Sequence, residues 1–306
     1  MTRGNPSVER AARVLTVLAA EPEHSFTLAD LVRRTGLSKA TCHALLASLV
    51  DARWLLRHSA GPNYRLGPGL IALGEAATRG YPALPYAEDE MREIGAQTGL
   101  ECLASAVVGN EIVILAKNGT PAPLAASVGI GARVPLVPPL ATVFFAWSSE
   151  TAVIAAFSWA AELDGTSPSL LTESYRAGLA AVRERGYSIG LENPVRERLG
   201  RALASQLASG HSGGASNAQL VSRLADEDYQ LIETGGGPYW LNHLAAPVFD
   251  AQGRVSLAMT LVGFPSQLTA DEVHDLGRRL RTAADRVTAA VHGSVPSSGA
   301  PKEVLL

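Results

Sequence analysis

Cysteine is scarce in this chain, because Cys42 and Cys102 are the only two among 306 residues. Two cysteines are too few for a disulfide framework or a Cys-based zinc site, so we expect a reduced, cytoplasmic environment. Long apolar runs are also missing. The most apolar stretch, residues 141–161, is broken by Ser148-Ser149-Glu150, which predicts two amphipathic or buried helices and no membrane partner. The first residues show no apolar run of the kind found in secretory signals.

Catalytic signatures are absent as well. No H-x-x-x-H, H-E-x-x-H or G-x-S-x-G pattern occurs, and His211, His243 and His274 stand in unrelated contexts. The Gly235-Gly236-Gly237 run has no following Lys-Ser/Thr, so it predicts a loop and not a phosphate cradle. We therefore expect no catalytic residue, no metal site and no cofactor.

Charged residues make up only 18% of the chain, and the net charge is −3. They are unevenly distributed. Residues 1–80 hold 10 Lys/Arg against 6 Asp/Glu, a net +4, and residues 81–306 carry −7. A basic N-terminal segment followed by an acidic remainder is typical of a DNA-binding domain joined to a separate sensing or assembly domain. Chance unevenness is the alternative interpretation.

A helix-turn-helix is predicted between Thr27 and Val50. Thr27 and Asp30 form a T-x-x-D capping box that begins a short helix, and Gly36 lies in the turn. Ser38 is a suitable N-cap for the second helix. Its apolar residues recur at i, i+3, i+4 and i+7, at positions Cys42, Leu45, Leu46 and Leu49.

The opposite face of this second helix carries small, hydroxyl and basic side chains and no acid before Asp51. Its candidate DNA-contacting residues are Lys39, Ala40, Thr41, His43 and Ala44, with Ala47 and Ser48 beside them. Such a face lets a helix enter a major groove, where alanine meets thymine methyl groups and Thr, His and Lys reach bases or phosphates. A helical hairpin buried in another core is the alternative.

Two flanking segments extend this interpretation. The runs 54–57 and 63–66 are typical of strands around the turn-rich loop 58–62, which predicts a wing with Arg57, Asn63 and Arg65 near DNA. Before the helix-turn-helix, Ser7 is expected to cap a helix with Val8, Ala11, Leu15 and Leu18 on one face. Arg10, on the other face of that helix, is a candidate phosphate contact.

The order of these motifs resembles a known family. The segments S-V-E-R-A-A-R-V-L (7–15), L-x-x-L-V-R-R-T-G-L-S-K-A-T-C-H-A-L-L (28–46) and Y-R-L-G (64–67) resemble the DNA-binding domain of IclR-family transcriptional regulators. The resemblance implies that the helix near residues 68–79 pairs two subunits, and a plain interdomain helix is the alternative. Ala44 departs from the family, which usually has a basic residue there, because an alanine side chain has no donor for a phosphate or a guanine.

The remainder of the chain has the pattern of mixed α and β structure. Strands are expected at 100–108 and 111–117 around the Gly109-Asn110 turn, then at 122–128, 133–136, 241–249 and 255–262. Helices are expected at 88–98, 138–147, 150–161, 172–185 and 269–291. The predicted fold class is α/β of the α+β kind, with an antiparallel sheet flanked by helices.

Three further segments resemble the IclR effector-binding domain: G-A-R-V-P-L (131–136), R-G-Y-S (185–188) and L-A-A-P-V-F-D-A-Q-G-R-V-S-L-A-M-T-L-V-G (244–263). The resemblance implies a GAF-like domain whose pocket lies between the sheet and the helix after residue 136. Position by position, the effector-site candidates are Leu140, Ala141, Val143, Phe144, Gly190, Glu192, His243, Thr260 and Val262, with Leu191 and Trp240 nearby.

Several of these positions depart from the family pattern. Residues 140–144 contain no Lys and two extra bulky side chains, Gly190 stands at an acidic position, and Val262 replaces one of two hydroxyls. A buried carboxylate ligand without donors costs several kcal/mol. We therefore expect a larger aromatic, alicyclic or acyl effector, and a filled cavity without effector is the alternative.

These interpretations define the expected domain organisation. A winged helix-turn-helix covers 1–66, a linker helix 67–82 and the effector-binding domain 83–293. The segment between Tyr187 and His243 is longer than in the resembled family, which implies an insertion at 195–240 with helices at 197–208 and 218–232. Residues 294–306 are expected to form a disordered tail.

The whole chain is thus expected to be a DNA-binding transcriptional regulator, a homodimer or homotetramer that binds a pseudo-palindromic double-stranded operator and a small-molecule effector. Repression and activation both stay open. An enzyme and a scaffold protein without DNA binding are the competing classes.

Overall fold

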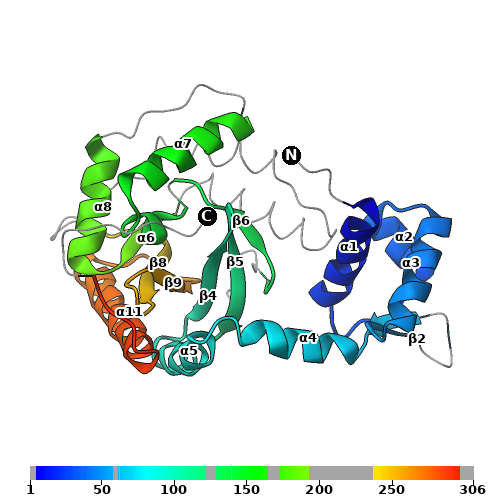
Figure 1. Ribbon diagram of the computed structural model, residues 1–306. Helices are drawn as coiled ribbons and strands as arrows, with labels where there is room; N and C mark the ends of the chain where they lie inside the picture. Colours follow the sequence, from blue (N-terminus) through cyan, green and yellow to red (C-terminus); the bar gives the residue numbers. More distant parts are fainter. Residues whose placement is uncertain are drawn as a thin grey trace. The chain divides into compact units, whose positions relative to one another are not determined.

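The computed structural model describes residues 5–57, 61, 63–120, 129–138, 140–164, 173–192 and 237–296. These form two compact units, one within residues 5–81 and the other from Pro82 onward. The strand expected at 122–128, the helices at 197–208 and 218–232 and most of the tail lie outside the described residues. Figure 1 shows the helices and strands.

The first unit contains three helices, a three-stranded sheet and a further helix. Its elements are α1 (Pro6–Ala20), β1 (Phe26–Thr27), α2 (Leu28–Thr35), α3 (Lys39–Asp51), β2 (Leu55–Arg57), β3 (Asn63–Leu66) and α4 (Gly69–Thr78). The sheet order is β1-β3-β2, and β1 is a strand that the sequence did not predict. The core is built from buried residues of the helices and strands, including Val17, Leu31, Leu46 and Leu55.

The start of α1 corrects the sequence prediction. Asn5, and not Ser7, is the N-cap, because Pro6 suits the first helical position and the Asn5 side chain accepts a hydrogen bond from the Ser7 N–H at 2.9 Å. The buried face consists of Val14, Val17 and Leu18, whereas Val8 is 65% exposed. The predicted apolar face was therefore wrong at its N-terminal end.

The second unit is built on one antiparallel sheet of order β6-β5-β4-β9-β8-β7. Its strands are β4 (Glu101–Val108), β5 (Glu111–Asn118), β6 (Arg133–Pro135), β7 (Ser188–Leu191), β8 (Leu241–Phe249) and β9 (Val255–Val262). The predicted hairpin β4–β5 and the strands β8 and β9 are confirmed, and β7 was not predicted as a strand.

Helices cover both faces of this sheet, as expected. On one face α5 (Leu84–Thr98) and α11 (Ala270–Ala290) lie side by side (Figure 1), joined by the Arg286–Glu90 ion pair and a 3.1 Å hydrogen bond from Arg279 to Gln97. The other face carries α6 (Thr142–Phe145), with α7 (Glu150–Asp164) and α8 (Glu173–Arg185) beside it (Figure 1).

Two helices differ in length from the sequence prediction. Helix α5 begins four residues earlier than expected, at Leu84, with a proline in its first turn. Helix α6 covers only Thr142–Phe145 and not 138–147. The sequence Val137-Pro138-Pro139 accounts for the absence of helix at 137 and 138, because a residue that precedes proline is disfavoured in the α region.

Candidate DNA interface and effector site

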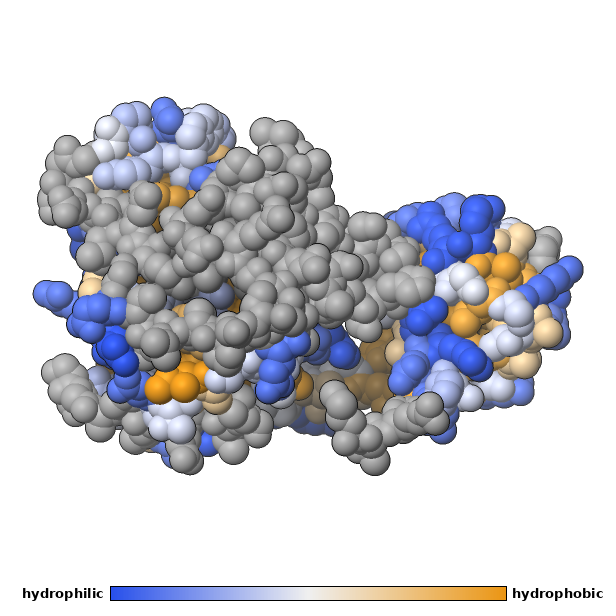
Figure 2. All heavy atoms as spheres, turned by 90° about the horizontal axis from the view of Figure 1, so that it is seen from above, coloured by the Kyte–Doolittle hydropathy of each residue, from blue (hydrophilic) through white to orange (hydrophobic). Residues whose placement is uncertain are grey.

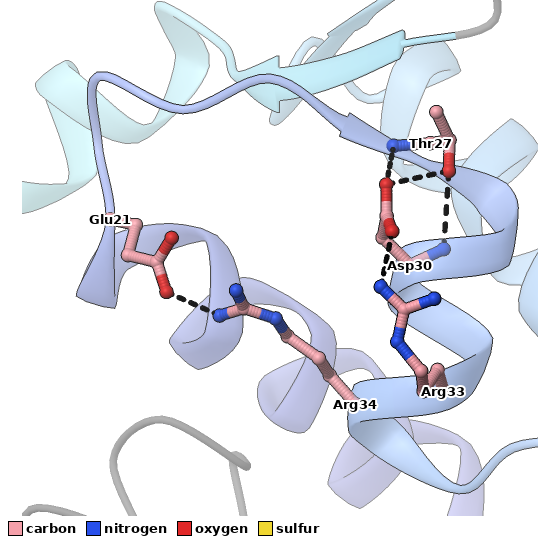
Figure 3. Close-up of polar contacts among 5 residues, drawn as sticks. All are labelled: Glu21, Thr27, Asp30, Arg33 and Arg34. Carbon is pink, nitrogen blue, oxygen red and sulfur yellow. Dashed lines mark hydrogen bonds and ion pairs between the residues drawn. The ribbon is translucent and has the colours of Figure 1, made fainter.

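The capping box at Thr27 positions the first helix of the helix-turn-helix. The Thr27 N–H donates to Asp30 Oδ2 and the Asp30 N–H donates to Thr27 Oγ1, each at 3.1 Å, and Arg33 pairs with the same carboxylate (Figure 3). Hydrogen bonds from Thr27, followed by that from Arg33, lower the pKa of Asp30 to about 2. The first turn of α2 is thereby fixed to β1.

Other basic side chains hold α2 against α1. Arg34 pairs with Glu21 at the end of α1 (Figure 3), and its guanidinium lies 4.9 Å from the centroid of the buried Phe26 ring. Arg13 of α1 donates a 3.1 Å hydrogen bond to the carbonyl of Thr35. Gly36 then makes the turn with a left-handed φ of 68°. These arginines therefore stabilise the domain.

Helix α3 begins as the sequence predicted. Ser38 Oγ accepts the Thr41 N–H at 3.2 Å and lies 2.9 Å from Thr41 Oγ1. Cys42, Leu46 and Leu49 are buried, and Leu45 is half-buried. The candidate contact residues Lys39, Ala40, His43 and Ala44 are all exposed, as are Ala47 and Ser48. Thr41 is half-buried, and its hydroxyl already takes part in the cap.

The wing residues are placed by the pairing of β2 with β3. Arg57 lies opposite Tyr64, and Arg65 lies opposite Leu56. Because side chains alternate along a strand, Arg57 and Arg65 project from opposite faces of the wing. Both are exposed, whereas Asn63 is half-buried opposite Thr27. The loop 58–60 and Pro62 lie outside the described residues.

The candidate cations of this unit are available to an external partner. Arg10, Lys39, Arg57 and Arg65 are exposed and form no ion pair with another described residue, unlike Arg33 and Arg34. On the face shown in Figure 2, hydrophilic side chains surround an apolar patch on this unit. Described carboxylates therefore do not neutralise these four cations.

In the second unit, three of the effector-site candidates belong to the core. Ala141, Val143 and Phe144 are 0%, 5% and 3% exposed, and they pack in one cluster with Ala245 and Ala258 of the sheet. Leu140 is half-buried beside them. The extra bulk that the sequence shows at 143–144 therefore fills space between α6 and the sheet.

The remaining candidates that belong to strands lie on the same face of the sheet, on β7, β8 and β9. Gly190, His243 and Val262 are neighbours across three strands, and Thr260 lies one row away, opposite Ala245. A Cβ atom at Gly190 would be 2.2 Å from His243 Cε1, so the His243 ring lies against this glycine. Half-buried side chains at 243, 260 and 262 mark this end as less tightly filled.

Two hydrogen bonds connect the exposed Glu192 with His243. Asn242 Nδ2 donates to Glu192 Oε2 at 2.9 Å, and Asn242 Oδ1 lies 3.1 Å from His243 Nδ1. Leu191, by contrast, is half-buried and Trp240 is 51% exposed. Glu192 therefore reaches His243 only through the Asn242 side chain.

An ion pair on this face was missed by sequence reasoning. Glu101 is 3% exposed and lies beside Val262 in register, and its carboxylate is 3.0 Å from Lys117 Nζ. Lys117 shares the face because β4 and β5 change register between Ala104 and Ser105. Without that β-bulge, Lys117 would lie opposite Cys102 and project from the other face. The sequence carries no clear signal for the bulge.

Within the described residues, no helix is long and apolar enough to cross a membrane, and no cluster of three His, Cys, Asp or Glu side chains is arranged for a metal ion. Cys102 is buried, and this burial raises the pKa of its thiol to about 12. The thiol is therefore neutral near pH 7.

Comparisons with known proteins agree with this architecture. A family model, the IclR helix-turn-helix domain, matches residues 7–59. The chain is 27% identical over 229 residues to the HTH-type transcriptional regulator XynR of Escherichia coli (strain K12), covering 71% of this chain and 90% of that protein.

Solved structures show the same fold. The Thermotoga maritima IclR structure is similar with a TM-score of 0.60 at 14% identity, covering 93% of this chain and 98% of that one. An IclR regulator from Alicyclobacillus acidocaldarius is similar with a TM-score of 0.57 at 22% identity, covering 94% and 99%. Relatives of this kind are transcriptional regulators and not enzymes. The chain therefore carries an N-terminal IclR-type helix-turn-helix domain and is a DNA-binding transcriptional regulator that is similar, over most of its length, to regulators of the IclR family.

Proposed function

We propose that α3 lies in the major groove of an operator, with Lys39, Thr41 and His43 contacting bases. The observation that carries this proposal is the exposed face of α3, which has only small, hydroxyl and basic side chains and no acid before Asp51. Ala40 and Ala44 are then close enough for contact with thymine methyl groups. The Ser38–Thr41 hydroxyl contact orients Thr41, and a hydroxyl keeps capacity for a further hydrogen bond.

Phosphate contacts are proposed for Arg10, Arg57 and Arg65, with Asn63 beside them. Arg57 and Arg65 project from opposite faces of the wing. A wing placed between two phosphate backbones would therefore offer one arginine to each. Both are charged at any pH near neutrality, and neither pairs with a described carboxylate.

We further propose that the regulator works as a homodimer, or as a tetramer built from two such dimers, in the cytoplasm, where its DNA lies. No residue of α4 is buried, although Leu70, Ile71 and Leu73 are apolar and Ile71 and Leu73 are 68% and 49% exposed. A second copy of the chain is the proposed partner for this face. Two-fold symmetry then sets two α3 helices about 34 Å apart on a pseudo-palindrome.

For the effector, we propose the sheet face around Thr260, His243 and Val262, next to the Glu101–Lys117 pair. Thr260 and His243 are polar side chains there, and they lie beside the apolar Val262 and Ala245 on the same face. Apolar walls with a few placed polar groups favour an aromatic, alicyclic or acyl ligand. The burial of Phe144 and Val143 supports the second candidate, a regulator whose second domain binds no effector.

The DNA proposal is tested by gel shift against the DNA upstream of the protein's own gene, over a range of salt concentrations. The double variant Lys39→Ala, Arg65→Ala should bind more weakly, and the salt slope should fall by about one unit for each phosphate that is no longer neutralised. Arg92→Ala removes an exposed arginine of α5, paired with Asp89, and is the matched control. Unchanged affinity in the double variant would refute the assignment.

A further inference from the structure

The start of helix α4 is hydrogen-bonded to Arg53 and Trp54, which lie just after the end of α3. The Gly67 N–H donates to the carbonyl of Trp54 at 2.7 Å, and the Gly69 N–H donates to the carbonyl of Arg53 at 3.0 Å. Trp54 is itself tied to α3, because its N–H donates to the carbonyl of Leu49 at 2.9 Å. Three backbone hydrogen bonds thus connect the end of α3 with the start of α4.

This connection requires glycine at both positions where the chain approaches α4. A Cβ atom at Gly67 would lie 2.4 Å from the Arg53 carbonyl oxygen, and one at Gly69 would lie 2.8 Å from the same atom. The obstructing atom belongs to the backbone, so it has no flexible side chain to swing aside. Arg53 is also held in the left-handed region, with a φ of 62°, which is uncommon outside glycine.

The wing strengthens the same connection. Leu55 and Leu66, the residues just after Trp54 and just before Gly67, are paired between β2 and β3, and Leu55 is fully buried. Beyond this point α4 buries none of its residues. Its direction relative to α3 is therefore set at its first turn.

We propose that the Arg53–Gly67–Gly69 junction is a rigid joint that makes α3 and α4 move as one body. A rotation imposed on α4, by its partner copy or by the second domain, then reaches α3 without being absorbed in a flexible linker. The regulatory meaning of the joint rests on the proposed function, in which α3 is the DNA-contacting helix, whereas its rigidity does not.

Rigidity is measured first, in the full chain without DNA. Cysteines placed at the exposed positions Ala47 of α3 and Ala76 of α4 carry spin labels, while the native Cys42 and Cys102 are buried. Labelled chain is diluted with unlabelled chain, so that double electron–electron resonance reports distances within one chain. A single narrow distance distribution is expected. A broad distribution would overturn the proposal.

Glycine variants then test whether the junction is the cause. Gly67→Ala and Gly69→Ala should broaden or shift the distribution and weaken operator binding about tenfold, roughly the effect of removing one base contact. Gly74→Ala is the matched control, because a Cβ atom there meets nothing within 4 Å. It should leave the distance distribution unchanged. Gly178→Ala in α8, where a Cβ atom also meets nothing within 4 Å, is the control for operator binding, because Gly178 lies outside α4.

The outcomes separate this proposal from the DNA assignment. If Gly67→Ala does not fold, Gly69→Ala, with the smaller clash, decides the matter. Unchanged distributions in every variant that folds would overturn the joint. A third outcome is a narrow distance distribution that Gly69→Ala broadens, in a protein that binds no operator. That outcome would support the rigid joint and refute the proposed function.

Discussion

At Gly277 of α11 the ring of Tyr187 occupies the space that a Cβ atom would need. Such an atom would lie 2.2 Å from Tyr187 Cε2. The ring is held in place from other sides, because its hydroxyl lies 2.8 Å from His274 Nδ1 and the Arg185 guanidinium lies over it, 5.4 Å from its centroid. This single glycine therefore lets the R-G-Y-S segment pack against α11.

Gly277→Ala should consequently destabilise the second unit by about 1–3 kcal/mol, the usual cost of overpacking a core. Gly178→Ala in α8 is its matched control, since a Cβ atom there meets nothing within 4 Å. That control should be neutral or stabilising by up to about 1 kcal/mol, because alanine favours helix. Urea denaturation followed by circular dichroism measures both, and equal stability of the two variants would contradict this packing account.

Asp30 makes the DNA-binding unit sensitive to acid. Its pKa is lowered to about 2 in the folded protein from an ordinary value of 3.8, mainly by hydrogen bonds from Thr27. The stability that it contributes is therefore fully present above about pH 4 and is lost as the pH falls towards 2.

Comparison with Asp30→Asn isolates this contribution. The difference in unfolding free energy between wild type and variant should be constant from pH 7 to about pH 4 and should shrink as the pH falls further. Denaturant titrations at several pH values measure it. A difference that stays constant down to about pH 2 would show that the Asp30 charge does not stabilise the capping box.

At the scale of single elements, the exposed apolar face of α4 predicts that a charge placed there prevents dimerisation. Ile71→Glu places a charge on the exposed apolar face, and a charge buried in a dimer interface without a partner is strongly unfavourable. We expect this variant to be monomeric where the wild type is dimeric, with weaker operator binding. Ile154→Glu on α7, at a position 47% exposed, is the control.

Light scattering at micromolar concentration measures the assembly of both variants. A wild-type monomer would refute the pairing of α4, and a dimeric Ile71→Glu variant would place the interface elsewhere.

At the scale of the whole molecule, the chain combines a DNA-binding unit with a second unit whose proposed ligand face is partly filled. The apolar end around Phe144 is core, and the end around Thr260 is half-buried. An effector that binds there stabilises the folded protein by mass action, by about 2.7 kcal/mol at a hundredfold excess over its dissociation constant.

Thermal-shift titration with phenol, cyclohexanol, 1-octanol, pyruvate and glyoxylate tests this. We expect stabilisation by at least one of the first three, reduced in Thr260→Val, which removes only a hydroxyl from the face. Thr282→Val on α11, whose hydroxyl donates to the carbonyl of Arg278, is the matched control. Shifts with pyruvate or glyoxylate alone would refute the apolar-ligand proposal, and no shift with any probe would favour the ligand-free domain.

Local signals in the sequence determined much of the DNA-binding unit. The capping box at Thr27, the left-handed glycine at 36 and the Ser38 cap each depend on residues within a few positions, so α2 and α3 were predicted with their ends. The turn at Gly109-Asn110 likewise predicted β4 and β5. The short strand β1 was missed because two residues are too few to show the alternation of apolar and polar side chains that predicts a strand. Its pairing with β3 also depends on residues far apart in the sequence.

Tertiary structure alone decided which side chains meet on the second unit's sheet. A one-residue bulge between Ala104 and Ser105 moves Lys117 to the face of Glu101, and a one-residue change of register reverses the face of every later side chain. Packing of α6 against the sheet likewise makes Val143 and Phe144 part of the core, at positions where the family resemblance implied an effector site. Caps and turns are local and can be read from the chain, whereas register and cavity filling depend on contacts between distant segments.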